Sequence, residues 1–206
     1  MTIEAVVFDL GNVVVEWNPE RYYDARIGRE RREAMFAETG IHAVNTAIDG
    51  GAPFQGSIYA LADRFPRWAP EIRLWHDDQL GMTQPVIHRT LRLIEALKVR
   101  RVPVFALSNW GDESFDRAVA FYPFLGAFDR LYVSGKLGMK KPAPGIYAHL
   151  EADSGVAPNR LLFTDDRVEN IRTAELRGWQ VHLFTGPAGL EARLVREGLI
   201  DPLPEI

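Results

Sequence analysis

The stretch Ala5–Val14, "AVVFDLGNVV", places one carboxylate, Asp9, directly after four apolar residues. Leu-Gly-Asn follows, and because Gly and Asn are frequent turn formers, the chain is expected to turn just beyond the carboxylate. A short apolar run without alternation is typical of a strand buried on both faces of a sheet. The stretch therefore predicts a strand over Ala5–Phe8, with Asp9 either as a turn residue or as a group held up to a ligand.

Similar apolar runs recur along the chain, separated by segments of helical pattern. The predicted strands are Val102–Leu107, Leu161–Phe163 and Val181–Phe184, with Leu131–Val133 as a candidate fifth. Two of the intervening segments, Thr90–Lys98 and Glu113–Tyr122, carry apolar side chains on one helical face. Strands that alternate with helices predict an α/β fold built on a parallel sheet.

The segment from Trp17 to about His88 departs from this alternation, because helical patterns and loops follow one another there without a convincing strand. It comes immediately after the first predicted strand. We therefore expect an all-helical cap, residues 17–88, inserted into an α/β core made of residues 1–16 and 89–206. A chain of 206 residues is long enough for such a core with a small inserted module.

Composition excludes several kinds of protein. The chain has 47% apolar and 25% charged residues, no cysteine and a formal net charge of -4. The lack of cysteine excludes disulfides, thiolate metal sites and cysteine nucleophiles. The acidic balance argues against nucleic-acid binding, and the lack of a signal-peptide pattern or of an apolar run of about 20 residues argues against a membrane partner. We expect a soluble, cytoplasmic protein whose oligomeric state the sequence leaves open.

Polar residues gather where the predicted strands end. They are Asp9, Ser108, Asn109, Asp165 and Asp166, with the pair Lys140 and Lys141 in a connecting loop. Each has an ordinary structural explanation as a turn residue, a helix N-cap or a solvated charge. In an open parallel sheet, however, ligands bind outside the carboxyl ends of the strands. Their shared location therefore indicates a functional site at that edge.

These residue types fit phosphate chemistry. Three carboxylates brought together repel one another and would hold a hard divalent cation, and an all-oxygen ligand set favours Mg²⁺. A carboxylate that attacks a phosphate group is repelled by it, so the pair needs cations beside it. Mg²⁺ and a lysine would supply this charge, while Ser108 and backbone N–H groups could hydrogen-bond the phosphoryl oxygens.

Four motifs of the sequence resemble those of the haloacid dehalogenase superfamily. They are "VVFDLGNVV", "ALSNW", "KKP" and "FTDDRVENI", in the order and approximate spacing found in that family. The resemblance implies a three-layer, Rossmann-like core with a cap inserted after the first motif. It also implies an enzyme, a Mg²⁺-dependent phosphatase that acts on a small phosphorylated metabolite such as a sugar phosphate through an aspartyl-phosphate intermediate.

The resemblance assigns roles to individual residues. Asp9 is implied as the nucleophile, Ser108 as the ligand of the phosphoryl oxygens, and Lys141, with Lys140 as the alternative, as the stabiliser of charge. The implied metal ligands are Asp9, the backbone carbonyl of Gly11, Asp165 and Asp166. The implied substrate contacts are Asn109, Gly11 and Asn12.

Gly11 departs from the family pattern. Phosphatases of the family generally carry there an aspartate that protonates the leaving alcohol and then activates water. Asn12 cannot replace it, because an amide does not exchange a proton near neutral pH. General acid–base assistance is worth about 10²- to 10⁴-fold. Three hypotheses follow: a substrate with a good leaving group, a reaction other than phosphoryl transfer, or a substitute acid from the cap, for which the candidates are His42, Asp49 and His76.

Two alternative functions remain open at the level of sequence. The 2-haloacid dehalogenases also lack the second aspartate, and in that reaction Asp9 would displace halide from carbon without a metal; the retained Asp165–Asp166 pair argues against it. The other alternative is a catalytically impaired, phosphate-binding regulatory protein. Trp17 and Trp110 lie near the first two motifs, where they either line the pocket or serve packing.

Overall fold

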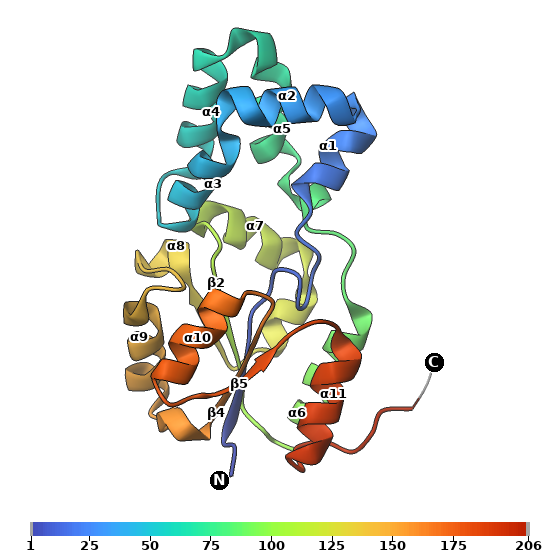
Figure 1. Ribbon diagram of the computed structural model, residues 1–206, viewed down its shortest axis with the longest axis vertical. Coiled ribbons are helices and arrows are strands. Elements are labelled where there is room, and N and C mark those ends of the chain that lie inside the picture. The colour runs from blue at the N-terminus through green and yellow to red at the C-terminus, as the bar shows by residue number, and fades with distance from the viewer. Residues whose placement is uncertain (1, 205–206) are drawn as a thin grey trace.

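Figure 1 shows the computed structural model, which describes residues 2–204. Its core is one five-stranded sheet in the order β3-β2-β1-β4-β5, and every neighbouring pair of strands is parallel. The first strand of the sequence is therefore the central one. The strands are β1 (Ala5–Phe8), β2 (Val104–Ser108), β3 (Arg130–Val133), β4 (Leu161–Asp165) and β5 (Gln180–Leu183).

Helices cover both faces of the sheet, each face with its own apolar cluster. Val6 and Phe8 of β1 belong to one cluster and Ala5 and Val7 to the other, because successive side chains of a strand alternate between faces. The first cluster includes residues of α6 (His88–Val99), α7 (Asp112–Phe121) and α11 (Pro187–Arg196), and the second includes residues of α9 (Pro144–Ser154) and α10 (Val168–Leu176). This arrangement confirms the predicted α/β fold.

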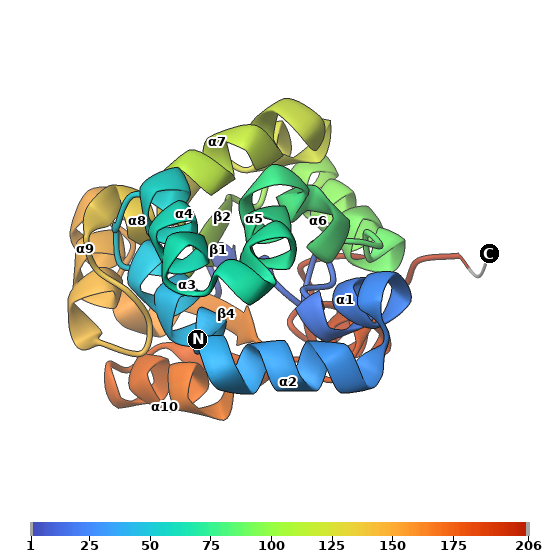
Figure 2. The same ribbon diagram turned by 90° about the horizontal axis from the view of Figure 1, so that it is seen from above.

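The first five helices gather at one end of the sheet, above the carboxyl ends of the strands (Figures 1 and 2). A third apolar cluster, separate from the two on the sheet, holds them together, and Tyr23, Trp68 and Trp75 are its largest fully buried side chains. The helices are α1 (Pro19–Ile27), α2 (Arg29–Thr39), α3 (Ile41–Asp49), α4 (Phe54–Arg64) and α5 (Ala69–Asp77), with the 3₁₀ turns η1 (Pro66–Trp68) and η2 (Gln79–Met82).

The chain enters and leaves this helical bundle at one place. Val15 and Val86 form an antiparallel bridge, so the two connecting segments run side by side. Because the bundle has its own apolar cluster and a single paired connection, we propose that residues 17–88 form a cap on a core made of residues 1–16 and 89–206.

Two strands differ from their predictions in an informative way. β2 begins at Val104, two residues later than predicted, and Pro103 before it has no N–H to donate to a sheet ladder. The expectation that the strands are buried on both faces is wrong for β5, in which Leu183 is 40% exposed. β5 pairs only with β4 and lies at the edge of the sheet.

None of the helices formed within residues 2–204 is both long and apolar enough to cross a membrane.

Candidate active site

A buried ion-pair cluster lies at the carboxyl edge of the sheet. The Lys141 Nζ lies 2.9 Å from Asp9 Oδ1 and 2.6 Å from Asp165 Oδ2. All three side chains are nearly inaccessible to solvent; Lys141 as a whole residue is 2% exposed. Lys141 therefore joins two carboxylates that come from neighbouring strands of the sheet.

The sheet fixes where the two carboxylates stand. Asp9 follows β1 directly, and its backbone N–H donates to the carbonyl of Thr164 on β4 at 2.9 Å. Asp165 is the last residue of β4. The Leu10 N–H donates to Asp9 Oδ1 at 2.7 Å, so the turn after β1 holds the carboxylate as well as reversing the chain. Asp9 is thus both a turn residue and a member of the cluster.

Asp165 is held by more groups than Lys141 alone. The Asn170 Nδ2 donates to Asp165 Oδ1 at 3.0 Å and to Oδ2 at 2.9 Å, and the Arg167 N–H donates to Oδ1 at 2.8 Å. Both oxygens of Asp165 are therefore engaged by protein donors. Asp165 lies behind Lys141, whereas Asp9, Lys141 and Asp166 line an open pocket.

Asn109 fixes the backbone of Lys141. The Asn109 Nδ2 donates to the Lys141 carbonyl at 2.9 Å, and the Lys141 N–H donates to Asn109 Oδ1 at 2.8 Å. Because both ends of this amide are engaged, we propose that Asn109 positions the lysine. Ser108, the last residue of β2, is buried beside it and lines the pocket.

Asp166 is oriented from the first loop. The Asn12 Nδ2 donates to Asp166 Oδ2 at 3.1 Å, and Asn12 Oδ1 accepts from the Trp17 N–H at 2.9 Å. Asn12 has a φ of 56°, a left-handed conformation that Asn tolerates better than most residues. The turn after β1 therefore points an amide at the carboxylate after β4.

The charges of the cluster shift its proton affinities. Burial raises the pKa of Asp9 to about 7, and Asp165 and Asp166 add to this while Lys141 opposes it. Burial alone would lower the pKa of Lys141, but the charges of Asp9 and Asp165 outweigh it and raise that pKa. Lys141 is therefore a permanent cation. One lysine faces three carboxylates, which leaves an excess of negative charge.

The geometry of the carboxylates fits a divalent cation. One oxygen from each of Asp9, Asp165 and Asp166 can be chosen so that all three lie within 4.8 Å of one another. Such a set of hard oxygen donors with excess negative charge suits Mg²⁺. The implied carbonyl of Gly11 belongs to a residue that lines the same pocket.

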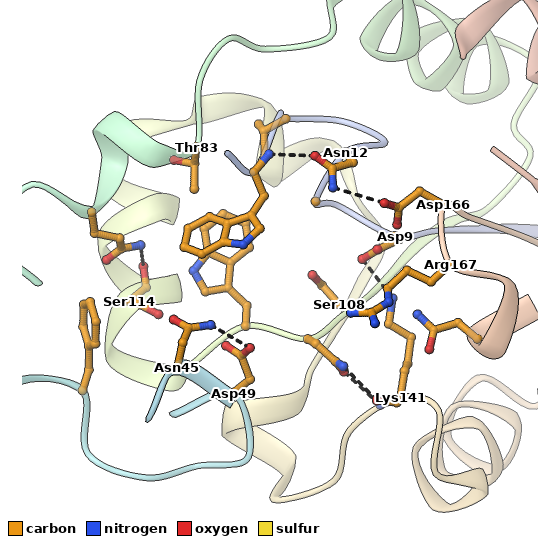
Figure 3. A pocket seen from close by; sticks show the side chains of 18 of the residues that line it. Asp9, Asn12, Asn45, Asp49, Thr83, Ser108, Ser114, Lys141, Asp166 and Arg167 are labelled. Atoms are coloured by element: carbon orange, nitrogen blue, oxygen red, sulfur yellow. Dashed lines mark hydrogen bonds and ion pairs between the residues drawn. The ribbon is translucent and has the colours of Figure 1, made fainter. Parts of the chain in front are cut away.

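The cap forms the opposite wall of the pocket. Its lining residues are Asn45, Asp49, Phe54, Trp75, Gln79 and Thr83, and Trp17 and Trp110 also line the pocket. Figure 3 shows Asn45 and Asp49 across the pocket from Asp166 and Arg167. Trp17 packs edge-on against Trp75 with 5.9 Å between ring centroids, so it both packs and lines the pocket.

The structure separates the remaining candidates named from the sequence. Lys140 points away from the ion-pair cluster, and its Nζ donates to the Thr46 carbonyl at 3.1 Å. Of the three cap residues considered as substitute acids, Asp49 lines the pocket. His42 is exposed and packs on Phe36. The His76 ring is buried and contacts Asp77 and Arg117. Neither histidine belongs to the pocket lining.

Sequence reasoning missed several residues of this site, most of which line the pocket. Asn45, Gln79 and Arg167 line the pocket, and Asn170 also holds Asp165. Asn170 lies within the motif "FTDDRVENI", five residues after Asp165, so its place in that motif was an available signal. Asn45 and Gln79 carry no such signal, since only the fold brings them near the strand ends.

Two characterised relatives are phosphatases. The chain is 27% identical over 198 residues to the D-ribitol-5-phosphate phosphatase of Bacteroides thetaiotaomicron, covering 86% of this chain and 90% of that protein. It is 24% identical over 178 residues to a sesquiterpene phosphatase of Aspergillus oryzae, covering 86% of this chain and 87% of that protein.

Solved structures share the fold. A haloacid dehalogenase family enzyme of Bacteroides thetaiotaomicron superposes with a TM-score of 0.73 at 20% identity, covering 90% of this chain and 95% of that chain. The wild-type form of that enzyme has also been solved in complex with magnesium and inorganic phosphate, and it superposes with a TM-score of 0.69 at 22% identity, covering 89% and 95%. The L-2-haloacid dehalogenase of Xanthobacter autotrophicus superposes with a TM-score of 0.62 at 20% identity, covering 98% and 85%.

The family model for haloacid dehalogenase-like hydrolases matches residues 3–176, which include the strands β1 to β4 and the helical bundle. The four motifs, the parallel sheet and the ion-pair cluster at its carboxyl edge all lie in or next to this range. The chain therefore belongs to the haloacid dehalogenase-like family of hydrolases.

Proposed function

We propose that this protein is a Mg²⁺-dependent phosphatase that acts on a small phosphorylated metabolite through an aspartyl-phosphate on Asp9. The observation that carries the proposal is the placement of the Lys141 Nζ between Asp9 and Asp165, beside Asp166 at the floor of an open pocket. This arrangement sets a nucleophilic carboxylate next to a fixed cation, which an anionic substrate requires.

Asp9 attacks the phosphorus atom, and the bond from phosphorus to the leaving oxygen breaks. The Leu10 N–H and the Lys141 Nζ both contact Oδ1 of Asp9, so we assign the attack to Oδ2. Lys141 balances the charge of the phosphoryl group, and Ser108 donates a hydrogen bond to one of its oxygens. Water then hydrolyses the aspartyl-phosphate, which releases inorganic phosphate and restores Asp9.

The residues that would hold Mg²⁺ are Asp9, the carbonyl of Gly11 and Asp166, with Asp165 as a supporting carboxylate. Asp165 receives this supporting role because protein donors already engage both of its oxygens. When bound, Mg²⁺ supplies positive charge to the phosphoryl oxygens. Asn12 and Asn170 keep Asp166 and Asp165 in place, as hydrogen-bonding partners of metal ligands commonly do.

The relatives support the phosphatase proposal, because two characterised proteins similar over 86% of this chain are phosphatases. One acts on a phosphorylated polyol, by its name, and the other on a phosphorylated terpene. We propose a sugar phosphate-like substrate, because the cap wall combines aromatic rings with amide and carboxyl groups that can bind hydroxyls.

Dehalogenation is the second candidate, and Gly11 is the observation that favours it. The halide that leaves a haloacid needs no proton, so the lack of an acid at position 11 would not slow dehalogenation. Against it stands Asp166, a carboxylate that lines the pocket and would repel an anionic haloacid. We therefore place phosphatase activity first.

Phosphate release tests the proposal. The purified protein is incubated with an aryl phosphate and a panel of sugar and polyol phosphates, with Mg²⁺ and again with a chelator. We expect release that depends on Mg²⁺. Absence of release from every ester, together with halide release from a 2-haloacid in the presence of chelator, would overturn the proposal in favour of dehalogenation.

A further inference from the structure

Position 11 leaves the proposed reaction without a group that protonates the leaving alcohol. The titratable side chains that line the pocket are Asp9, Asp49, Lys141, Asp166 and Arg167. The proposed function already uses the first carboxylate, the lysine and Asp166. Arginine does not give up its proton in proteins. Asp49 is therefore the one lining residue of the described chain that remains free to exchange a proton.

The cap presents Asp49 to the loop that follows Ser108. Asp49 is the last residue of α3, and its carbonyl accepts a hydrogen bond of 2.5 Å from the Ser134 hydroxyl. The oxygen of that hydroxyl also accepts from the Trp110 N–H at 2.9 Å. Ser134 thus ties Asp49 to a residue only two positions beyond Ser108.

A glycine allows this close approach. A Cβ added to Gly111 would lie 2.5 Å from the Ile48 side chain and 3.3 Å from the Ile48 carbonyl, so a larger residue there would push α3 away. The Gly111 N–H also hydrogen-bonds the Asp49 carboxylate. The loop after β2 therefore receives the end of α3 directly, and Figure 3 shows Ser108 and Asp9 between Asp49 and Asp166.

The surroundings of Asp49 suit proton exchange. Burial raises the pKa of Asp49 to about 7, while the charge of Lys140 and the Gly111 N–H lower it. The Asn45 Nδ2 donates to Asp49 Oδ2 at 3.1 Å and fixes one oxygen. General acids and bases work best when their pKa lies near the operating pH, because both protonation states are then available.

We propose that Asp49 is the general acid–base residue of this enzyme, supplied by the cap in place of the carboxylate absent at position 11. This inference rests on the proposed phosphatase function. As Asp9 bonds to phosphorus and the bond to the leaving oxygen breaks, Asp49 gives its proton to that oxygen, and a neutral alcohol departs. The Asp49 carboxylate then takes a proton from water, the water oxygen bonds to phosphorus, and the bond from phosphorus to Asp9 breaks.

The test compares Asp49→Asn with the wild type on two substrates that differ in their need for a proton. One is an alkyl phosphate that the wild type hydrolyses, and the other is 4-nitrophenyl phosphate, whose phenolate leaves as an anion. We expect the first turnover of the alkyl phosphate to fall by about 10²-fold or more, with that of the aryl phosphate nearly unchanged. Later turnovers slow for both, so nitrophenol appears as a burst followed by slow release.

Two further variants make the test specific. Asp63→Asn removes a cap carboxylate of α4 whose side chain is 75% exposed and outside the pocket, so its kinetics should match the wild type. Gly11→Asp in the Asp49→Asn background should restore alkyl phosphate turnover. A Cβ at position 11 would lie 3.8 Å from Trp17 Cβ, an ordinary contact, so the backbone there accepts a side chain without a clash at Cβ.

The possible results separate this inference from the proposed function. Equal loss on both substrates in the first turnover, or a change in KM alone, would overturn the acid–base role of Asp49 while phosphatase activity stands. Failure of Gly11→Asp to rescue a folded Asp49→Asn variant would also overturn it. Absence of phosphate release from the wild type would instead overturn the proposed function.

Discussion

On the core side of the pocket every carboxylate is tied to another part of the sheet edge, whereas the cap side keeps a polar atom without a partner. Lys141 joins Asp9 to Asp165, and Asn12 holds Asp166. Across the pocket, Gln79 is 4% exposed, yet its Oε1 has no hydrogen-bond partner within the described chain. A buried polar atom without a partner costs free energy unless a ligand or water satisfies it.

The difference indicates that the two walls of the pocket have different roles. The core wall, which holds Asp9, Lys141 and Asp166, suits the two phosphoryl-transfer steps that we propose, since its groups are already oriented before substrate arrives. The cap wall offers the unpaired Gln79 Oε1 together with Asn45, Asp49 and aromatic rings, which suits recognition of the leaving group. We therefore expect substitutions on the core wall to affect the reaction with every substrate, and substitutions on the cap wall to affect the first step of the reaction selectively.

The largest effect is expected for Asp9→Asn. An amide is a poor nucleophile, so phosphate release should fall on the order of 10⁴-fold or more for every substrate. The fold should persist, because Asn retains an oxygen for the Leu10 N–H and is nearly isosteric. Steady-state phosphate release and circular dichroism measure the two effects. Substantial activity in a folded variant would remove Asp9 from the role of nucleophile.

Lys141→Met should destabilise the core wall. Removal of one partner from a buried ion pair leaves the remaining charges uncompensated and typically costs about 3–5 kcal/mol. Denaturant unfolding at neutral pH in the presence of chelator measures this loss, and Lys140→Met is the matched control because Lys140 lies outside the cluster. Equal stability of the two variants would show that Lys141 does not stabilise the buried cluster.

Asn12→Gly should weaken metal binding without straining the backbone. Glycine adopts a φ of 56° readily, so the variant removes the amide that orients Asp166 and accepts from the Trp17 N–H, while the backbone keeps its conformation. Loss of a group that orients a metal ligand typically lowers metal affinity about 10- to 100-fold. Calorimetric titration with Mg²⁺ measures the change. An unaltered affinity would show that Asp166 needs no support from the first loop.

The smallest effect concerns the stability of the cap wall. The pKa of Asp49 is about 7 in the folded chain and near its ordinary value of 3.8 when unfolded. The folded state therefore keeps a proton that the unfolded state loses, and stability falls as pH rises from about 4 to 7. Asp49→Asn removes this penalty, so we expect the variant to be more stable than the wild type at pH 8 and equally stable near pH 4. Melting curves at the two pH values check this, and a gain that is equal at both would contradict it.

Much of the core wall could be predicted from the sequence. The apolar run before Asp9 specifies a buried strand, and parallel pairing necessarily brings the residue after β1 beside the end of β4. The choice between Lys140 and Lys141 could not be made, because adjacent residues of a loop differ only in the direction that packing gives them. The structure places the Lys141 side chain in the cluster and that of Lys140 against α3.

The cap wall could be predicted only in outline. Helical pattern and the absence of strands identified the segment, but the residues of a helix that face a pocket depend on how the helix docks. Asp49 was one of three candidates of equal standing, and contacts to Ser134 and Gly111, which lie 60 residues or more along the chain, distinguish it. Asn109 and Asn12 were expected to contact the substrate, and those roles stay predictions. In the structure, Asn109 hydrogen-bonds the backbone of Lys141, and Asn12 hydrogen-bonds the side chain of Asp166.

The proposed mechanism depends most directly on a covalent bond between Asp9 and phosphorus. The measurement is a rapid quench of a single turnover with a phosphate monoester, followed by mass spectrometry of the peptide that contains Asp9, with Asp49→Asn used to prolong the intermediate. We predict a phosphoryl adduct on Asp9 that is lost on treatment with hydroxylamine. An unmodified Asp9 during turnover, or a carbon ester on Asp9 formed from a 2-haloacid while phosphate esters leave it unmodified, would contradict the account.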